Sequence, residues 1–391
     1  MFANTPRGLS IVEEDLAGST DANIKTSDGV VKKEKITPIA PFALTLPMTN
    51  PDGKAWNSDV HVYPKNQENE LDKVVEDRGV TVGETFTYTL STTSTGADAN
   101  GDGKMDGADL GGVYEIVDTL NSNLSYKSAT VKIGGKAATE NSDYTLTKTS
   151  EGTPASDKVT IAFKGGGLDK IAAGTKIEVV LTVTLKKVPE GGITPNKATL
   201  YPNKWSKDNG KPVKSPEVVT KHGDIVIKKV DESGTKPLSG AVFEVRLADT
   251  TTKRCSDLSK LGPVIKTSKA TGADGLVKIS DLQLTNWING KEVAGKDQVP
   301  YCLVEKTAPE GYQLLPKAIE FKLTKEGTVT DLSGAIAANA GNVSEGNAYT
   351  IKNYKNPGLP LTGAQGILLV SVLGLILVSV GVVLTVKRRK D

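Results

Sequence analysis

An apolar segment close to the C-terminus constrains this chain more than any other feature. It runs from Gly366 to Val386 without a charged residue, and the basic residues Lys387 to Lys390 follow it. At about 1.5 Å of rise per residue, a helix of this length spans the roughly 30 Å hydrocarbon core of a bilayer. Because basic residues stay on the cytoplasmic side of a membrane, the preceding part of the chain is expected outside the cell.

A short motif precedes the predicted transmembrane helix: Leu359, Pro360, Leu361, Thr362 and Gly363. Motif, helix and basic tail in this order resemble the cell-wall sorting signal of Gram-positive surface proteins. The resemblance implies that a sortase cysteine attacks the Thr362 carbonyl, releases the chain from Gly363 onward and passes the acyl group to an amine. The alternative is an ordinary membrane anchor behind a chance motif.

The rest of the sequence is typical of β-structure. Apolar and polar residues alternate over 85–90, 177–185, 243–247 and 319–323. A period of two residues predicts half-buried antiparallel strands. With only 5% aromatic residues and frequent Thr, Val and Gly, the 391-residue chain is expected to be all-β, with room for two or three sandwich domains.

Several classes of function are poorly supported by the composition. A formal net charge of +2 gives no electrostatic case for nucleic-acid binding. The chain has only two histidines, His61 and His222, which supplies neither a Ser-His-Asp triad nor a histidine-rich metal site. We therefore do not expect an enzyme.

The first 29 residues lack the apolar run of a signal peptide that an exported protein needs. We expect either that translation starts further upstream or that the allele is truncated. Changes in composition divide the chain into a partial N-terminal domain (1–66), a middle sandwich (67–220), a C-terminal sandwich (221–357) and the sorting signal (358–391).

The segment from Trp56 to Lys65 resembles the pilin motif of sortase-assembled backbone pilins. The resemblance implies that the amine of Lys65 attacks the acyl-sortase intermediate and becomes joined to Thr362 of another copy. A solvated surface lysine at the end of a strand is the alternative. A chain that carries both an acyl donor and an amine acceptor can polymerise head to tail without limit.

The segment from Tyr301 to Tyr312 is similar to the E-box of the same pilins, with Lys306 where threonine is commoner. The resemblance implies tandem immunoglobulin-like sandwiches of the CnaA and CnaB types. It also implies that Glu305 catalyses an amide bond between a lysine on the first strand and an asparagine on the last. Burial favours this chemistry, because it leaves the amine neutral and the carboxylic acid protonated.

The partners of Glu305 are expected at the two ends of the C-terminal domain. Asn353 lies in the final predicted strand, and either Lys228 or Lys229 lies in the first. Alternation places Lys228 on the face of Val226 and Val230, so we prefer Lys228. Exposed lysines and an asparagine in a turn are the alternative.

The middle domain follows the same plan by resemblance. Lys73 is expected to bond to Asn196, with Asp118 as the catalytic acid. The competing interpretation of Asp118 is a residue that forms a turn at a strand end.

Two cysteines are present, Cys255 and Cys302. An even number of cysteines in an exported chain favours a disulfide.

A stretch of oxygen-bearing side chains in the middle domain predicts a structural calcium site. Oxygen ligands at loop positions 1, 3, 5, 9 and 12, glycine at position 6 and a backbone carbonyl at position 7 follow the EF-hand order. The corresponding residues are Asp98, Asn100, Asp102, Gly103, Lys104, Asp106 and Asp109. A solvated acidic turn is the alternative, and Asp109 in place of glutamate indicates weak binding.

Together these motifs identify the chain as a member of the backbone pilins of Gram-positive bacteria. The resemblance implies a cell-surface pilus subunit whose partners are a pilin-specific sortase, a housekeeping sortase, other copies of itself, minor pilins and peptidoglycan. The sequence identifies no host receptor. A wall-anchored monomeric adhesin is the alternative, and it would not need Lys65 in its motif.

Overall fold

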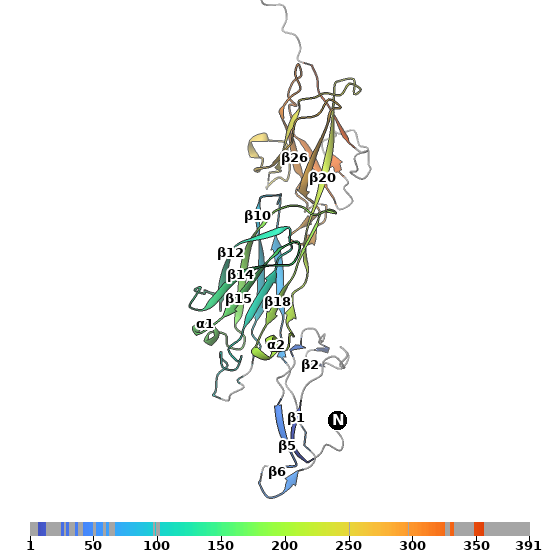
Figure 1. Cartoon of the computed structure of the whole chain (residues 1–391). Coiled ribbons are helices and arrows are strands. Elements are labelled where there is room, and N and C mark those ends of the chain that lie inside the picture. The colour runs from blue at the N-terminus through green and yellow to red at the C-terminus, as the bar shows by residue number, and fades with distance from the viewer. Residues whose placement is uncertain are drawn as a thin grey trace, which may run out of the picture.

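The computed structural model describes residues 7–12, 25–26, 29–30, 36–37, 42–49, 52–57, 60–61, 67–96, 98, 102–249, 251–295, 297–324, 329–331 and 348–355. Figure 1 shows two β-sandwiches one after the other, with short N-terminal strands beyond the first. The all-β prediction is confirmed, since the only α-helices among the described residues are α1 (Gly166–Asp169) and α2 (Lys204–Asp208). Within that part of the chain no helix is long and apolar enough to span a bilayer, and the segment from Gly366 lies outside it.

The N-terminal part consists of short antiparallel strand pairs. These are β1 (Gly8–Val12) with β5 (Phe42–Leu46), β2 (Lys25–Thr26) with β3 (Gly29–Val30), β4 (Ile36–Thr37) with β8 (Gln67–Glu68), and β6 (Met48–Thr49) with β7 (Trp56–Asn57). Leu9 and Ile11 are 72% and 75% exposed. Among the described residues, the hydrophobic cores begin only at Leu71.

The middle sandwich packs two five-stranded antiparallel sheets against each other. The first has the order β13 (Lys136–Ala137), β12 (Leu124–Ile133), β16 (Lys176–Leu185), β10 (Thr85–Thr93), β9 (Leu71–Glu76). The second has the order β14 (Tyr144–Glu151), β15 (Ser156–Phe163), β11 (Glu115–Thr119), β18 (Ala198–Tyr201), β19 (Val213–Lys214).

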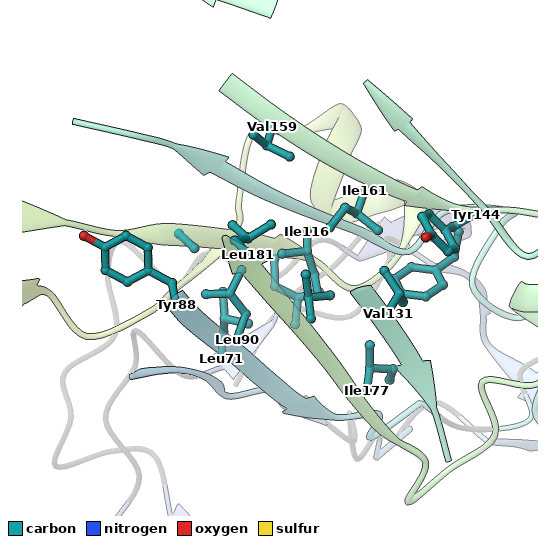
Figure 2. Packing of buried hydrophobic residues seen from close by; sticks show 14 of the residues in the cluster. Leu71, Tyr88, Leu90, Ile116, Val131, Tyr144, Val159, Ile161, Ile177 and Leu181 are labelled. Carbon is teal, nitrogen blue, oxygen red and sulfur yellow. The ribbon is translucent and has the colours of Figure 1, made fainter. Parts of the chain in front are cut away.

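Alternate residues of these strands form one continuous core. On β16, Ile177, Val179 and Leu181 are fully buried, as the sequence pattern predicts. Figure 2 shows Ile177 and Leu181 with residues of the facing sheet, and Tyr88 lies at one end of the cluster. Each such aliphatic side chain stabilises the fold by about 1.5–3 kcal/mol relative to an exposed one.

The C-terminal sandwich has a separate core around Phe243, Tyr301 and Phe321. One sheet has the order β22 (Val264–Thr267), β21 (Val242–Leu247), β26 (Tyr301–Thr307), β27 (Ile319–Leu323), β28 (Val329–Asp331). The other has β17 (Ile193–Asn196), β20 (Val218–Val230) and β23 (Leu276–Gln283), and β29 (Tyr349–Lys352) runs parallel to β20. A 3-10 helix, Leu258–Lys260, and a hairpin of β24 (Trp287–Ile288) and β25 (Lys291–Glu292) complete this part.

The long strand β20 runs through both sandwiches. Its first residues pair with β17, which directly precedes β18 of the middle sandwich, and its later residues pair with β23 and β29. Val218 packs in the middle core, whereas Ile225 packs in the C-terminal core. The boundary predicted between residues 220 and 221 therefore falls inside one continuous strand.

Candidate functional site

Lys73 is buried because of the alternation of β9. Leu71, Lys73 and Val75 point into the core, and Lys73 is only 3% exposed. The pKa of Lys73 is lowered by burial, although Asp118 opposes the shift. The Nζ atom also lies 4.5 Å from the centre of the Tyr88 ring. Burial thus shifts the equilibrium of this amine toward its neutral, nucleophilic form.

The predicted acid lies directly beside this amine. Lys73 donates a hydrogen bond to Oδ2 of Asp118, a buried residue of the central strand β11. Burial raises the pKa of Asp118, and Lys73 and Asn196 oppose the shift. Asp118 is therefore a core residue and not a turn former at a strand end.

Asn196 reaches the same place from β17. It is 4% exposed, and it precedes Ala198, which pairs with Asp118 across β11 and β18. Within the described part of the chain, neither amide atom of Asn196 makes a hydrogen bond of ordinary geometry. The structure thus brings together Lys73, Asp118 and Asn196.

The C-terminal sandwich also holds a buried cluster of a lysine, a carboxylic acid and an asparagine. Lys229 Nζ lies 3.0 Å from Glu305 Oε1 and donates to Asn353 Oδ1 at 2.8 Å. Asn353 Nδ2 donates to Glu305 Oε1 and Oε2 at 3.1 and 3.3 Å. The side chains of Lys229 and Glu305 are both 0% exposed, and Asn353 is equally buried. Burial lowers the pKa of Lys229, and Glu305 opposes the shift.

The preference for Lys228 is wrong. Lys228 is exposed, whereas Lys229 shares the inner face of β20 with Ile225 and Ile227. Val226 and Val230, which suggested the opposite face, are buried but do not belong to the central core. Both faces of this strand are covered at those positions, so hydrophobicity alone did not identify the inner one.

Aromatic rings near both amines were missed in the sequence. Tyr88 lies beside Lys73, and Phe243 lies with its ring centre 5.5 Å from Lys229 Nζ. The alternating patterns of β10 and β21 place Tyr88 and Phe243 in the core. The sequence therefore predicted that these rings are buried, but not that they contact the lysine amines.

The two cysteines form a disulfide between a loop and β26, with Cα atoms 5.6 Å apart. Glu320, also buried, accepts a hydrogen bond from the Cys255 backbone N–H at 3.0 Å. The departure from the E-box at Lys306 has a structural partner, since its Nζ lies 2.9 Å from Glu244 Oε1.

The described part of the predicted calcium loop is held by its own hydrogen bonds. Asp98 accepts hydrogen bonds from the backbone N–H groups of Asp102 and Gly103 at 3.2 and 2.8 Å, and Gly103 has φ +93°. Asp106 accepts from Ala108 N and forms an ion pair with Lys104 Nζ at 2.8 Å. Among the described residues, no three His, Cys, Asp or Glu side chains are arranged to hold a metal, and Asn100 lies outside them.

The predicted sortase residues Lys65, Leu359, Pro360, Thr362 and Gly363 also lie outside the described residues. Family models nevertheless match the segments that contain them. Residues 13–67 match the N-terminal D1 domain of Gram-positive pilin subunits, and residues 351–391 match the LPXTG cell wall anchor motif. Between them, residues 72–221 match the Sgo0707 N2 domain and residues 223–335 a prealbumin-like fold domain.

Curated relatives match nearly the whole chain. Fimbrial subunit type 2 of Actinomyces naeslundii is 31% identical over 94% of this chain and 68% of its own length. Fimbrial subunit type 1 of Actinomyces viscosus is 31% identical over 99% of this chain and 78% of its own. These relatives are structural subunits and not enzymes.

Solved structures agree with this relationship. The full-length major pilin SpaD of Corynebacterium diphtheriae is 26% identical, with a TM-score of 0.56 over 81% of this chain and 72% of that chain. The fimbrial protein FimP of Actinomyces oris is 27% identical, with a TM-score of 0.58 over 90% of this chain and 80% of that chain. The chain therefore belongs to the sortase-assembled major pilins of Gram-positive bacteria, the structural fimbrial subunits of cell-wall-anchored pili.

Proposed function

We propose that the subunits of this pilus are linked through Thr362 and Lys65. A pilin-specific sortase would hold Thr362 as an acyl-enzyme until the Lys65 amine of another copy attacks it. A housekeeping sortase would pass the final acyl group to peptidoglycan, and minor pilins would join the same fibre. The matched D1 domain ends at residue 67 and the matched anchor begins at residue 351, which puts the two groups near opposite ends of the chain.

Internal amide bonds would make each subunit resistant to load. The buried cluster of Lys229, Glu305 and Asn353 is the observation that carries this proposal, because its lysine and amide are already in contact. Lys229 Nζ attacks Cγ of Asn353, a new N–C bond forms and the C–Nδ2 bond breaks. Glu305, which contacts both nitrogens, moves the proton from the amine to the leaving group, and ammonia departs.

The middle sandwich supports the same reaction with Asp118 as the acid. Lys73 and Asp118 are in contact, and Asn196 is buried beside them. Each bond would join an early strand of its sandwich to a late one. Tension along the fibre would then be carried by covalent bonds and not by hydrogen bonds between strands.

Calcium binding by residues 98–109 remains a separate proposal for rigidity. It rests on the ligand order and on the Asp98–Gly103 turn, which resembles that of an EF-hand loop. Isothermal titration of the full chain with Ca²⁺, beside Asp98→Ala, tests it. We expect heat of binding in the unsubstituted chain but not in Asp98→Ala. Equal titration curves for the two proteins would contradict calcium binding by this loop.

The linkage is tested by immunoblots of wall extracts from the source strain. The native locus with its upstream DNA is compared with Lys65→Ala and with Lys54→Ala, a control at an exposed lysine of the same N-terminal part. We expect a high-mass ladder in the native and Lys54→Ala strains and a single band in Lys65→Ala. A ladder that survives Lys65→Ala would assign the linking amine to another residue. A single band in every strain would favour a wall-anchored monomer.

A further inference from the structure

The C-terminal sandwich reaches into the middle one with the tip of a hairpin. This tip, Asn289 and Gly290 between β24 and β25, has positive φ at both residues, 53° and 71°. The backbone N–H of Asn289 donates to Asp77 Oδ1 at 2.7 Å, and Asn289 Oδ1 accepts from the backbone N–H of Asp77 at 3.3 Å. Asp77 directly follows β9 and is fully buried. The tip is thus fixed to the end of the strand that carries Lys73.

Gly290 lies against two residues that flank the middle cluster. A Cβ atom at this position would come 3.0 Å from Val75 Cγ1 and 3.7 Å from Val218 Cβ. Val75 follows Lys73 by two residues on the same face of β9. Val218 is the cross-strand partner of Asn196. The tip therefore contacts the neighbour of the lysine and the neighbour of the asparagine at the same time.

Backbone pairing alone does not hold β9, which carries Lys73, next to β17, which carries Asn196. Among the described strands, β9 pairs with β10, and β17 pairs with β20. Asn196 is consequently placed by β20, most of which belongs to the C-terminal sheet. The short connection from Asn196 to Ala198 on β18 is a second restraint on the position of Asn196, and it comes from within the middle sandwich.

Two further contacts fix the turn that follows β9. Gln283 Oε1 accepts hydrogen bonds from the backbone N–H groups of Gly79 and Val80. His222 Nε2 lies 3.0 Å from the carbonyl oxygen of Val80 and donates to it. Gln283 and His222 are 1% and 5% exposed and come from β23 and β20. The C-terminal sandwich therefore holds β9 at its end by three separate groups.

We propose that docking of the C-terminal sandwich positions Lys73 and Asn196 for their reaction. Asn289 and Gly290 are positioning residues for the middle cross-link, which forms only after the C-terminal sandwich has folded and docked. The inference rests on the proposed amide bonds. Its physical basis is that reaction rates between held groups depend steeply on alignment, and an error of about 1 Å can cost about 100-fold.

The test follows both bonds in the full chain during cell-free synthesis. Each bond lowers the mass by one ammonia, and peptide mapping assigns it to Lys73–Asn196 or to Lys229–Asn353. In Gly290→Val we expect the middle bond to form at least about tenfold more slowly, with Lys229–Asn353 unchanged. Gly135→Val is the matched control, because Gly135 has a similar φ of +78° and no atom within 4 Å of its Cβ position.

A second pair covers the case in which valine at position 290 disturbs the fold. Asn289→Ala removes the acceptor for Asp77 N, and Asn141→Ala changes another asparagine of positive φ, 66°, in a turn of the middle sandwich. Slower formation of the middle bond in Asn289→Ala, with an unchanged rate in Asn141→Ala, supports the proposal. Unchanged rates in Asn289→Ala and Gly290→Val would overturn it and leave β18 to position Asn196. If neither bond forms in the unsubstituted chain, the proposed cross-links are wrong and this inference fails with them.

Discussion

The two clusters each combine a lysine, a carboxylic acid and an asparagine, and they differ in how the asparagine is held. Asn353 accepts a hydrogen bond from Lys229 and donates to both oxygens of Glu305, all within one sandwich. Asn196, in contrast, makes no hydrogen bond of ordinary geometry through its amide among the described residues, although it lies close enough to Asp118 to lower the pKa of that residue. The C-terminal cluster is therefore complete by itself, whereas the middle cluster depends on neighbouring structure for its alignment.

The difference follows from strand connectivity. Asn353 follows β29, which lies beside β20 with Ile351 in register with Lys229. The lysine and asparagine strands of this sandwich are thus direct neighbours. In the middle sandwich, the strands of Lys73 and Asn196 belong to different sheets. The same chemistry can accordingly be supported by one sheet or by a junction between domains.

Removing the acids gives the largest expected effect. Glu305→Ala should abolish Lys229–Asn353 and spare Lys73–Asn196, and Asp118→Ala should do the reverse. General acid–base catalysis contributes about 100- to 10,000-fold in rate, so each bond should be absent on the time scale of protein production. Intact mass and peptide mapping measure this. Loss of Lys229–Asn353 in Asp118→Ala would contradict the independence of the C-terminal cluster.

The choice of lysine sharpens the comparison on the C-terminal side. Lys229→Ala should remove the bond, while Lys228→Ala should leave it intact because Lys228 is exposed. For a loop of 124 residues, the chain-entropy model gives a loss of about 5 kcal/mol in the free energy of unfolding, as an upper figure. Denaturant unfolding of both variants measures it. Equal stability of the two variants would contradict the assignment to Lys229.

Only the C-terminal sandwich has a disulfide, which offers a smaller test of its independence. Replacing Cys255 and Cys302 by serine opens a loop of 47 residues and should cost up to about 4 kcal/mol. The loss should appear in the C-terminal transition by calorimetry, with Lys229–Asn353 still formed. A bond that fails to form would mean that the disulfide, and not the cluster alone, aligns Lys229.

The junction between the two sandwiches, where His222 contacts Val80, should have a stability that depends on pH. Burial lowers the pKa of His222 from 6.5 to about 4, although the Val80 carbonyl opposes the shift. Between these values the unfolded chain binds a proton that the folded chain does not, so stability should fall as the pH drops below 6.5. The loss accumulates to about 3 kcal/mol near pH 4.

His222→Gln keeps a donor for the Val80 carbonyl and should flatten this pH dependence. His61→Gln, at an exposed histidine, is the control. Urea unfolding at pH 4, 5 and 7 measures both. A pH dependence that is unchanged in His222→Gln would show that groups other than His222 dominate the response of this contact.

The strands could largely be predicted from local alternation, and the residues of both clusters from the resemblance to pilins. A period of two identified β10, β16, β21 and β27, and the E-box identified Glu305. The choice between Lys228 and Lys229 failed because β20 is covered on both faces near Val226 and Val230. A strand buried on both faces carries no alternation that reveals its inner side.

The junction could not be predicted because its parts leave no pattern. Asp77, Gln283 and His222 are single polar residues whose partners lie 142 or more residues away. Their burial depends on which domain surfaces meet, and that is decided by tertiary packing rather than by local propensity.

The strand β20 also limits how this protein can be divided or recombined. A fragment that ends before Val218 would leave β17 without its partner, and a fragment that begins at Lys221 would keep only Lys221 of the residues that pair with β17. An unpaired strand edge is a template for association with other chains. The two sandwiches are thus better regarded as one unit of inheritance and expression than as interchangeable modules.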